Sequence, residues 1–534
     1  MNKIAIYLSQ HLSGEVSSAQ SLRKRYATDG SILSIAPEIV AFPRVTNDVR
    51  KIARFTWQLA EKGHIVGVTA RGYGGDVTGA AIGKGIVIDM SQRLNRIIEI
   101  AAKDKLVHVQ PGTSLATLDE ALRWQGLTIP GLPHRHALKH ISVGGAIAND
   151  SLGDNGRITD SIKKLEVVLA NGDIIETGKL SKRDVSKKLG LQTLEGEIYR
   201  KLEGLLEDNE SLIEQLRNDT TRDNTGYKRI AEVRAKDGSF NLTPLFVGSQ
   251  GTLGIISEVV LKTEFYAVDE THVVIVAQSV QAARDVSERL LELEPNELRV
   301  IDGALLRRAV KNGSSFAVLG SVEQTGAVIY LRLNDFSVRA QDHKLKKLQK
   351  MLKKLQLVAI DSTERDPDDF RTITDLAHTL QLGSADGHLT MPLVNGVSIP
   401  ANRAEEFERA VAELAEKHHV ELPLELDIMA GTYDAHPLLG LDSVAEKQKV
   451  FKLITEYAAL VDKCGGAFAA DGAEGRVKAN AAWATLDEAQ ARLFEQVRAI
   501  FDPFGTLNPG VKQKGELRAL VATLRSSYDV ATVL

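Results

Sequence analysis

The sequence predicts an α+β protein of more than one domain. Up to about residue 265, strand-like and helix-like segments alternate, and from about residue 270 the pattern changes to strands alternating with long charged helices. The chain has 534 residues, 43% of them hydrophobic and 25% charged, which is enough for two or three packed domains. We therefore expect successive α+β domains along the chain.

The first half contains elements whose ends can be read from the sequence. Apolar spacing predicts a helix that Thr46 caps and Gly63 ends, and a second helix from Ser114 to Gln125. The dipeptide Asn171-Gly172 predicts a hairpin with a type I′ turn, because that turn needs positive φ at both central residues. The predicted strands are 65–68, 85–90, 106–110, 165–170, 173–177 and 252–261.

A glycine-rich loop, Arg71-Gly-Tyr-Gly-Gly-Asp-Val-Thr-Gly79, lies between two predicted strands. No helix follows it, so it is not a Rossmann fingerprint, and it lacks the Gly-Lys-Ser/Thr ending of a P-loop. Its glycines would let consecutive backbone N–H groups point at an anion such as a pyrophosphate. Glycine-rich turns are common, however, and the loop alone does not identify a ligand.

Other segments accompany this loop in a fixed order: 37–43 before it, and 85–98, 109–113, 141–149 and 248–256 after it. Over about residues 20 to 265, their order and spacing resemble the FAD-linked oxidase family of the vanillyl-alcohol oxidase and p-cresol methylhydroxylase type. The resemblance implies a two-subdomain FAD-binding domain of the p-cresol methylhydroxylase type plus an α+β substrate (cap) domain. The expected boundaries are a lead-in at 1–35, the FAD-binding domain at 36–265, the cap domain at 270–495, and a C-terminal segment at 496–534 that returns to the FAD-binding domain.

The resemblance also implies FAD as the cofactor and assigns residues to it. In the family the first loop cradles the FAD pyrophosphate, and a later segment lines the other side of the cofactor. Ile256 is expected on the adenine side, and Asn508, in the closing segment 501–510, is expected to approach the flavin. The first role falls to Gly72, Tyr73, Gly74, Gly75 and Asp76, and the second to Pro130, Ser142, Gly145 and Asn149.

Some relatives attach FAD covalently through a histidine just after the paired glycines. Asp76 occupies that position here, so we expect non-covalent FAD. His134, His136 and His140 crowd the second loop, and one of them could lie near the flavin or be linked to it. The alternative is that all three are solvated loop histidines.

Segments of the second half resemble the D-2-hydroxyacid dehydrogenase branch, which includes D-lactate and glycolate dehydrogenases. They are Asn224-Thr-Gly-Tyr227, Gly396-Val-Ser-Ile-Pro400 and the closing segment 501–510. Many members bind a divalent metal through a Gly-His-x-Gly-Asp-Gly-Asn-x-His stretch and a later Glu-His-Gly. Here these read Ile428-Met-Ala-Gly-Thr-Tyr-Asp-Ala-His436 and Asp471-Gly-Ala473. One imidazole and one carboxylate are a poor ligand set, so we predict no metal there.

Without a metal, oxidation of an alcohol needs a base for the hydroxyl proton. His436 is the candidate, oriented by Asp471 or Glu474; the alternative is a structural histidine before Pro437. A substrate carboxylate would need a cation. Arg371 and Arg476 are the candidates for that bidentate contact, and the alternative for each is an ordinary surface arginine.

Three functions follow from these residues. The first is an FAD-dependent dehydrogenase or oxidase that oxidises the hydroxyl of a small molecule, such as the D-2-hydroxy acids D-lactate or glycolate, by hydride transfer to flavin N5. The second is a sugar-alcohol or aldonolactone oxidase, which segments 130–133 and 143–148 also resemble. The third is a non-catalytic flavin-binding subunit, because the metal motif is degraded.

Bulk properties limit the partners. A net charge of −4 argues against nucleic acid, and the single cysteine, Cys464, fits a reducing compartment. No apolar run approaches the roughly 20 residues that a membrane-spanning helix needs, so we expect a cytoplasmic protein with a small-molecule substrate. Residues 344–357 read as a basic amphipathic helix, which either lies on anionic lipid or packs on its own domain. The electron acceptor and the oligomeric state cannot be read from the sequence.

Overall fold

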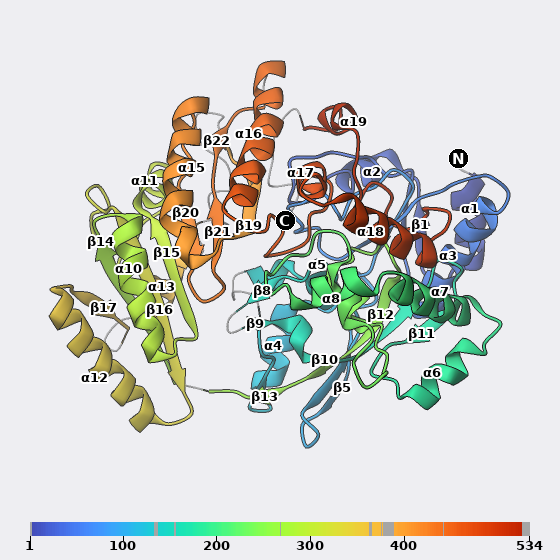
Figure 1. Ribbon diagram of the computed structural model, residues 1–534, viewed down its shortest axis with the longest axis horizontal. Coiled ribbons are helices and arrows are strands. Elements are labelled where there is room, and N and C mark those ends of the chain that lie inside the picture. The colour runs from blue at the N-terminus through green and yellow to red at the C-terminus, as the bar shows by residue number, and fades with distance from the viewer. Residues whose placement is uncertain are drawn as a thin grey trace.

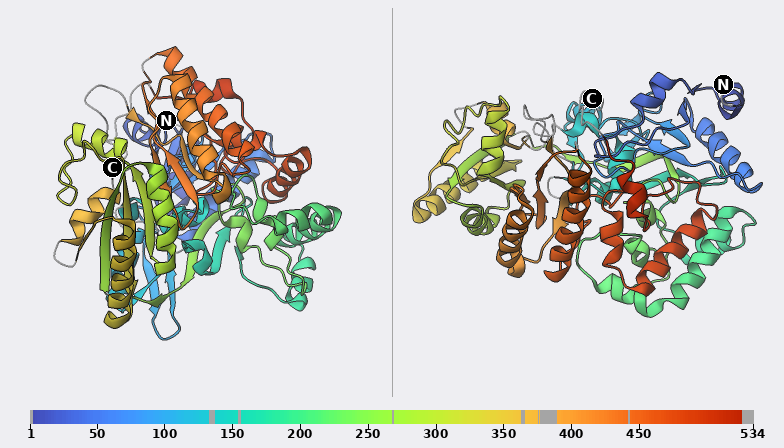
Figure 2. Two further views of the ribbon diagram at one scale, coloured as in Figure 1. Left: turned by 60° about the vertical axis from the view of Figure 1, so that its left-hand side comes forward. Right: turned by 90° about the horizontal axis from the view of Figure 1, so that it is seen from above.

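The protein, obtained as a computed structural model, folds into two α+β parts that lie side by side (Figure 1). The N-terminal part lies on the right of Figure 1, and the part that we call the cap domain lies on the left, an arrangement also visible from above in Figure 2. The structure describes residues 3–132, 137–153, 156–267, 269–362, 366–374, 376, 389–441 and 443–525.

The first subdomain is built on a four-stranded sheet of order β1-β2-β4-β3. Strands β2 (Ile39–Phe42), β4 (Ile86–Asp89) and β3 (Val68–Arg71) are parallel, and β1 (Glu15–Ser17) adds antiparallel to β2. Helix α3 (Thr46–Ala60) connects β2 to β3 and buries Val49, Ile52 and Ala53 in the core. The residue that precedes α3 is Val45, which offers no side-chain cap, so the prediction that Thr46 caps this helix is wrong.

The second subdomain is built on a five-stranded antiparallel sheet. Its strands run in the order β11 (Ile174–Glu176), β10 (Ile162–Val168), β12 (Ile255–Lys262), β6 (Leu106–Val109) and β5 (Ile97–Ala101). The predicted hairpin is present as β10–β11, but only Gly172 has a positive φ, of 83°. The turn is therefore not type I′: the Asn171 side chain instead accepts a hydrogen bond from the Asp173 amide at 2.9 Å.

Helices α4 (Leu115–Arg123) and α5 (Val143–Asn149) share the hydrophobic core of this sheet. Each begins as the sequence dictates: Ser114 accepts a hydrogen bond from the Thr117 amide at 3.1 Å, and Ser142 accepts one from the Gly145 amide at 3.1 Å. The start of α5 fixes the segment that faces the glycine-rich loop.

The cap domain is a seven-stranded sheet covered by helices on both faces. Helices α10 (Val280–Leu290), α12 (Val338–Leu355), α15 (Ala404–His418) and α16 (Val444–Lys463) bury the main core on one face. Helices α11 (Gly303–Lys311) and α13 (Pro367–Thr374) cover part of the other face. The strands run in the order β17 (Ala359–Asp361), β14 (Asp269–Ala277), β16 (Ala327–Asp335), β15 (Glu297–Asp302), β20 (Leu424–Asp427), β21 (Thr432–Ala435) and β19 (Val394–Ser398).

After the cap domain the chain returns to the N-terminal part. Helix α18 (Glu488–Phe501) buries Phe494, Val497 and Phe501 in the core of the second subdomain. Leu507 then pairs with Val68 of β3, so the closing segment lies against the first sheet. The exact domain boundaries stay predictions. Within the described residues, no helix combines the length and the apolar character that crossing a membrane requires.

Candidate functional site

A cavity lies where the glycine-rich loop, α5 and the start of β12 meet. Part of its wall is glycine backbone, from 72, 74 and 75 on one side and 144 and 145 on the other. Apolar side chains form another part: Met90, Pro111, Ile141, Ile255 and Ile256. Such a wall, with glycine backbone in one part and apolar side chains in another, fits a ligand that has a charged linker and flat aromatic rings.

The two walls touch at the glycine-rich loop. A Cβ atom on Gly72 would lie 2.2 Å from Ser142 Oγ, and one on Gly75 would lie 3.0 Å from the carbonyl oxygen of His140. Gly74 has a φ of 78°, which side-chain-bearing residues rarely adopt. The loop therefore needs glycine both for its path and for its close contact with the second wall.

Buried charged residues stabilise the glycine-rich loop through hydrogen bonds to backbone groups. Asp76 accepts hydrogen bonds from the amides of Thr78 at 3.0 Å and Ala80 at 2.7 Å, which fixes the turn after the glycines. Arg71 donates to the carbonyl of Thr28 at 2.7 Å. Burial raises the pKa of Asp76, and burial together with the nearby Asp76 charge raises the pKa of Asp29 to about 6.

This raised pKa predicts a pH dependence. A carboxyl whose pKa is higher in the folded state holds its proton more tightly there, so its stabilising contribution is lost as pH rises from its ordinary 3.8 to about 6. Asp29→Asn keeps the oxygen that accepts from the Ser31 amide but cannot ionise. We expect the free energy of unfolding of the wild type, relative to this variant, to fall by about 2–3 kcal/mol between about pH 4 and pH 7. Urea titrations over this range measure the difference, and parallel pH profiles would contradict the assignment.

Asn508 and Gln250 form hydrogen bonds that fix residues of the cavity wall. Asn508 Nδ2 donates to the carbonyls of Ala80 and Gln250, each at 2.8 Å, and both of those residues line the cavity. Gln250 Nε2 donates to Asn149 Oδ1 at 3.1 Å, and its Oε1 accepts from the Gly475 amide at 2.9 Å. Hydrogen bonds of Gln250 thus connect the closing segment (Asn508), helix α5 (Asn149) and the segment that contains Gly475, which we call the cap-side segment.

The predicted cofactor residues fall into two groups. Gly72, Tyr73, Gly74, Gly75, Asp76, Ser142, Gly145, Asn149 and Ile256 all line the cavity. Asn508 supports the wall through its hydrogen bonds, and Pro130 lies in the turn after β7 (Leu127–Thr128), outside the wall that the described residues form. His140 lines the cavity, whereas His134 and His136 lie outside the described residues. The individual cofactor contacts stay predictions.

A second, smaller cavity adjoins the first. One wall is the inner face of the cap sheet, where Glu425, Asp427 and Asp434 alternate with residues that point into the main core. Asp471 forms another wall and accepts from the Leu152 amide at 2.8 Å. Two residues later, the Ala473 amide donates to Asn149 Oδ1 at 3.2 Å. A three-residue segment, 471–473, therefore connects the wall of the large cavity to the polar cavity.

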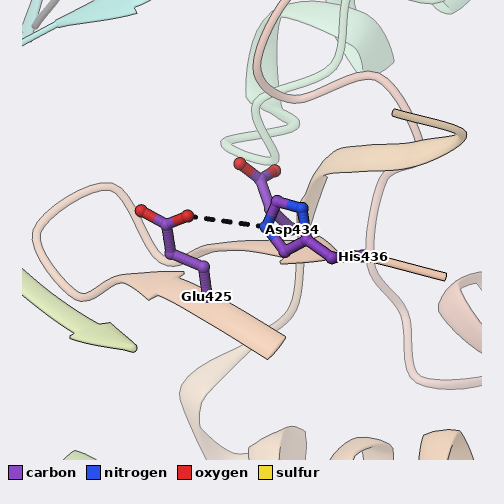
Figure 3. Close-up of side chains that lie close together, drawn as sticks. All are labelled: Glu425, Asp434 and His436. Atoms are coloured by element: carbon purple, nitrogen blue, oxygen red, sulfur yellow. Dashed lines mark ion pairs between the residues drawn. The ribbon is translucent and has the colours of Figure 1, made fainter. Parts of the chain in front are cut away.

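His436 completes a cluster at the end of β21 (Figure 3). Its Nε2 lies 3.5 Å from Glu425 Oε2, and donor atoms of Glu425, Asp434 and His436 all lie within 4.8 Å of one another. Burial would raise the pKa of Glu425, but His436 and Arg299 outweigh burial and lower it to about 2. Burial and the negative charge of Glu425 raise the pKa of Asp434 to about 6.

The three predicted catalytic residues are not brought together. His436 belongs to the polar cluster. Arg371 lies on α13 and pairs with Asp368 at 2.5 Å and Glu270 at 3.5 Å. Arg476 is buried behind the glycine-rich loop and donates to Gly79 at 2.5 Å and Pro509 at 2.7 Å, so its surface-arginine alternative is wrong.

Sequence reasoning missed Glu425 and Gln250. Glu474, proposed as a partner of His436, is instead bonded to Lys512 at 2.8 Å and Trp483 at 3.0 Å, and Glu425 takes its place beside the imidazole. The expectation of no metal counted one imidazole and one carboxylate. Glu425 and Asp434, which that count left out, both lie at His436, and the absence of a metal stays a prediction. The alternation Leu-Glu-Leu-Asp at 424–427 was the available signal for Glu425.

Sequence comparison supplies two kinds of relative. The chain is 24% identical to a D-2-hydroxyglutarate dehydrogenase of Haemophilus influenzae, over 97% of this chain and 53% of the relative. It thus spans about half the length of the first curated relatives it matches. It is 23% identical to glycolate oxidase subunit GlcD of Bacillus subtilis, over 89% of this chain and 88% of the relative.

Solved structures show the same fold. p-Cresol methylhydroxylase with substrate bound superposes with a TM-score of 0.68 at 13% identity, covering 97% of each chain. 4-Ethylphenol oxidase from Gulosibacter chungangensis gives a TM-score of 0.67 at 15% identity, covering 97% of this chain and 98% of the other. The predicted α+β architecture of the p-cresol methylhydroxylase type is therefore confirmed.

Two family descriptions match successive parts of the chain. Residues 37–178 match "FAD binding domain", and residues 269–511 match "FAD linked oxidases, C-terminal domain". The first range contains the glycine-rich loop and the second wall of the large cavity, and the second contains the polar cluster. The chain therefore belongs to the FAD-linked oxidase family of oxidoreductases, and FAD is its cofactor.

Proposed function

We propose that this protein oxidises the hydroxyl group of a small D-2-hydroxy acid with non-covalently bound FAD. The observation that carries the proposal is the placement of the small polar cavity against the large one. The segment 471–473 contributes Asp471 to the polar cavity and bonds through Ala473 to Asn149 in the wall of the FAD cavity. A small hydroxylated molecule in the polar cavity would lie beside the cofactor.

The names of the relatives support this substrate class. Those that the chain matches include D-2-hydroxyglutarate dehydrogenases and a glycolate oxidase subunit, whose names refer to 2-hydroxy acids. Non-covalent attachment is proposed because Asp76, which cannot form the histidine linkage seen in some relatives, follows the paired glycines.

The polar cluster supplies what the reaction requires of the protein. Oxidation of an alcohol to a carbonyl removes a hydride from carbon and a proton from oxygen. The residues that line the large cavity would hold FAD, which would supply the hydride acceptor. We assign the hydroxyl proton to the cluster that contains His436, whose imidazole is held beside Glu425 at 3.5 Å. Arg371 and Arg476 already bond to protein groups, so their role as cations for a substrate carboxylate stays a prediction.

Anaerobic flavin reduction tests the substrate class. We expect D-2-hydroxyglutarate, D-lactate or glycolate to bleach the flavin absorbance, and sugars and aldonolactones to leave it unchanged. In His436→Ala the rate of bleaching should fall by about 10²–10⁴-fold, the usual contribution of a group that handles a proton, with FAD content unchanged. His418→Gln is the matched control, because this cap histidine pairs with Glu456, away from the cluster.

The outcomes separate the alternatives. Bleaching by sugars or lactones alone would overturn the hydroxy-acid assignment in favour of a sugar-alcohol or aldonolactone oxidase. Bound FAD that none of these compounds reduces would indicate a non-catalytic flavin-binding subunit. Equal bleaching rates in His436→Ala and the wild type would remove His436 from the reaction.

A further inference from the structure

Helix α12 has one face in the core of the cap domain and the other in solvent. Gln341, Leu348 and Leu352 are buried, and Leu345 packs against the same core. The apolar stripe by which 344–357 read as an amphipathic helix is therefore already covered by the protein's own sheet. A partner of this helix would have to bind its outer face.

The outer face of α12 is strongly basic. Its exposed charged residues are one acidic residue, Asp342, and five basic residues, Arg339, Lys346, Lys350, Lys353 and Lys354. The first four basic residues are spaced by seven, four and three positions, so they follow one line along the helix. The helix carries six net positive charges whereas the whole chain carries −4, so the rest of the chain carries −10. Positive charge is thus concentrated in this one element.

The protein does not compensate this row of charges. The neighbouring carboxylates pair with other lysines of the helix: Asp335 with Lys344 at 3.4 Å, and Glu292 with Lys347 at 3.7 Å. Among the residues that the structure describes, none forms an ion pair with any of the five exposed basic residues. Like charges three and four positions apart destabilise a helix, so the row has an unfavourable energy unless something anionic binds it.

Exposed apolar side chains lie at both ends of the helix. Phe336 and Val338 are 72% and 65% exposed where the helix begins, and Val358 is 81% exposed just after it ends. Figure 1 and the view from above in Figure 2 show α12 as the outermost element at the cap-domain end of the molecule. A flat surface can therefore approach the helix along its length of about 27 Å.

We propose that the outer face of α12 binds the anionic surface of a phospholipid bilayer. Headgroups attract net positive charge without requiring a fixed geometry, which suits flexible lysines, and four of the five basic residues are lysines. A protein partner suits this face less well, because lysine is depleted in protein interfaces. The apolar side chains at the helix ends would enter the headgroup region and supply the second contribution that stable membrane attachment needs.

The same charge distribution orients the molecule. An anionic surface attracts α12 and repels the remainder of the chain, which carries −10. The cap domain would therefore face the bilayer, with the FAD-binding part farther from it. This contact involves neither the FAD cavity nor the polar cluster, so it does not depend on the substrate proposed above.

Co-sedimentation of the FAD-loaded protein with phospholipid vesicles is the test. We expect binding to mixed phosphatidylcholine–phosphatidylglycerol vesicles and no detectable binding to phosphatidylcholine alone. Binding should weaken with salt, because the Debye length falls from about 10 Å at 0.1 M to about 3 Å at 1 M. The variant Lys346→Gln/Lys350→Gln/Lys353→Gln should bind about 100-fold more weakly, since each basic residue near an anionic surface contributes about fivefold in affinity. Phe336→Ser should bind about tenfold more weakly.

Two controls separate α12 from other surfaces. Lys182→Gln/Arg183→Gln/Lys187→Gln removes the same charge from helix α6 (Lys182–Leu189), which lies toward the opposite end of the molecule (Figure 1). Trp124→Ser removes an aromatic side chain that is 86% exposed, but at the end of α4 in the second subdomain. Both proteins should bind the mixed vesicles as the wild type does. FAD absorbance should be equal in all variants, which shows that each is folded around its cofactor.

Several results would overturn the proposal. One is a wild type that does not bind the mixed vesicles, and another is an α12 triple variant that binds them as tightly as the wild type. Equal weakening by the α6 triple variant, or by Trp124→Ser as by Phe336→Ser, would show that a different surface faces the bilayer. A wild type that binds heparin but no vesicles would show that α12 receives a soluble acidic macromolecule instead of a membrane.

Discussion

A Gly72→Ala protein is expected to lose most of its FAD. The new methyl group would lie 2.2 Å from Ser142 Oγ and 3.0 Å from Ser142 Cβ, so it would force apart the two walls that meet at the glycine-rich loop. Overpacking of this kind costs about 1–3 kcal/mol, which corresponds to roughly 5–150-fold in affinity when it falls on the bound state. Titration of the apoprotein with FAD, followed by flavin fluorescence, measures the loss.

A rescue and a control make this result specific. Ser142→Gly removes both atoms that the methyl group would meet, so the double variant Gly72→Ala/Ser142→Gly should recover part of the affinity. Gly204→Ala is the control, because a Cβ there meets nothing within 4 Å and the residue lies in helix α7 (Leu194–Asp208). FAD affinity in Gly72→Ala equal to that of the wild type would show that the cofactor does not depend on this contact.

Lys512→Met should cause the largest loss of stability. Lys512 and Glu474 form an ion pair at 2.8 Å with side-chain exposures of 1% and 0%. Lys512 also donates to the Asn224 carbonyl at 2.6 Å, so it joins the N-terminal part, the cap-side segment and the closing segment. Removal of one partner leaves a buried charge unpaired, which costs about 3–5 kcal/mol. Guanidinium titrations of the two proteins measure this difference.

Two comparisons decide whether the buried pair is responsible. The double variant Lys512→Met/Glu474→Gln carries no unpaired charge and should be more stable than Lys512→Met alone. Lys417→Met breaks a pair with Glu456 in which the lysine side chain is 61% exposed, and it should cost no more than about 1 kcal/mol. If Lys417→Met and Lys512→Met were equally destabilising, the buried pair would not be the cause.

The cofactor site was largely predictable because its requirements are local. The two loops lie so close together that a side chain at Gly72 or Gly75 would clash, and the glycines of the segment 72–76 are therefore visible in the sequence itself. Helix α5 was not predicted, although Ser142, expected at the cofactor, both caps this helix and faces the loop. The hairpin at Asn171-Gly172 was located correctly, but its turn type was wrong because the Asn171 side chain stabilises a different backbone conformation.

The catalytic side was less predictable because it depends on contacts between distant residues. Glu425 reaches Asp434 and His436 only through the register of β20 on β21, which no local pattern specifies. Arg476 follows the degraded motif and was expected at the substrate, yet it folds back to bond to Gly79 and Pro509. The role of a buried arginine depends on which carbonyl groups lie near it, and tertiary packing determines which groups these are.

The absorbance spectrum of the purified protein before and after acid precipitation tests the central claim most directly. The account predicts flavin absorbance bands in the native protein and, after precipitation, all of the flavin in the supernatant, because Asp76 offers no covalent linkage. A yellow pellet would contradict the non-covalent assignment. A colourless protein that takes up no added FAD would contradict the cofactor site itself.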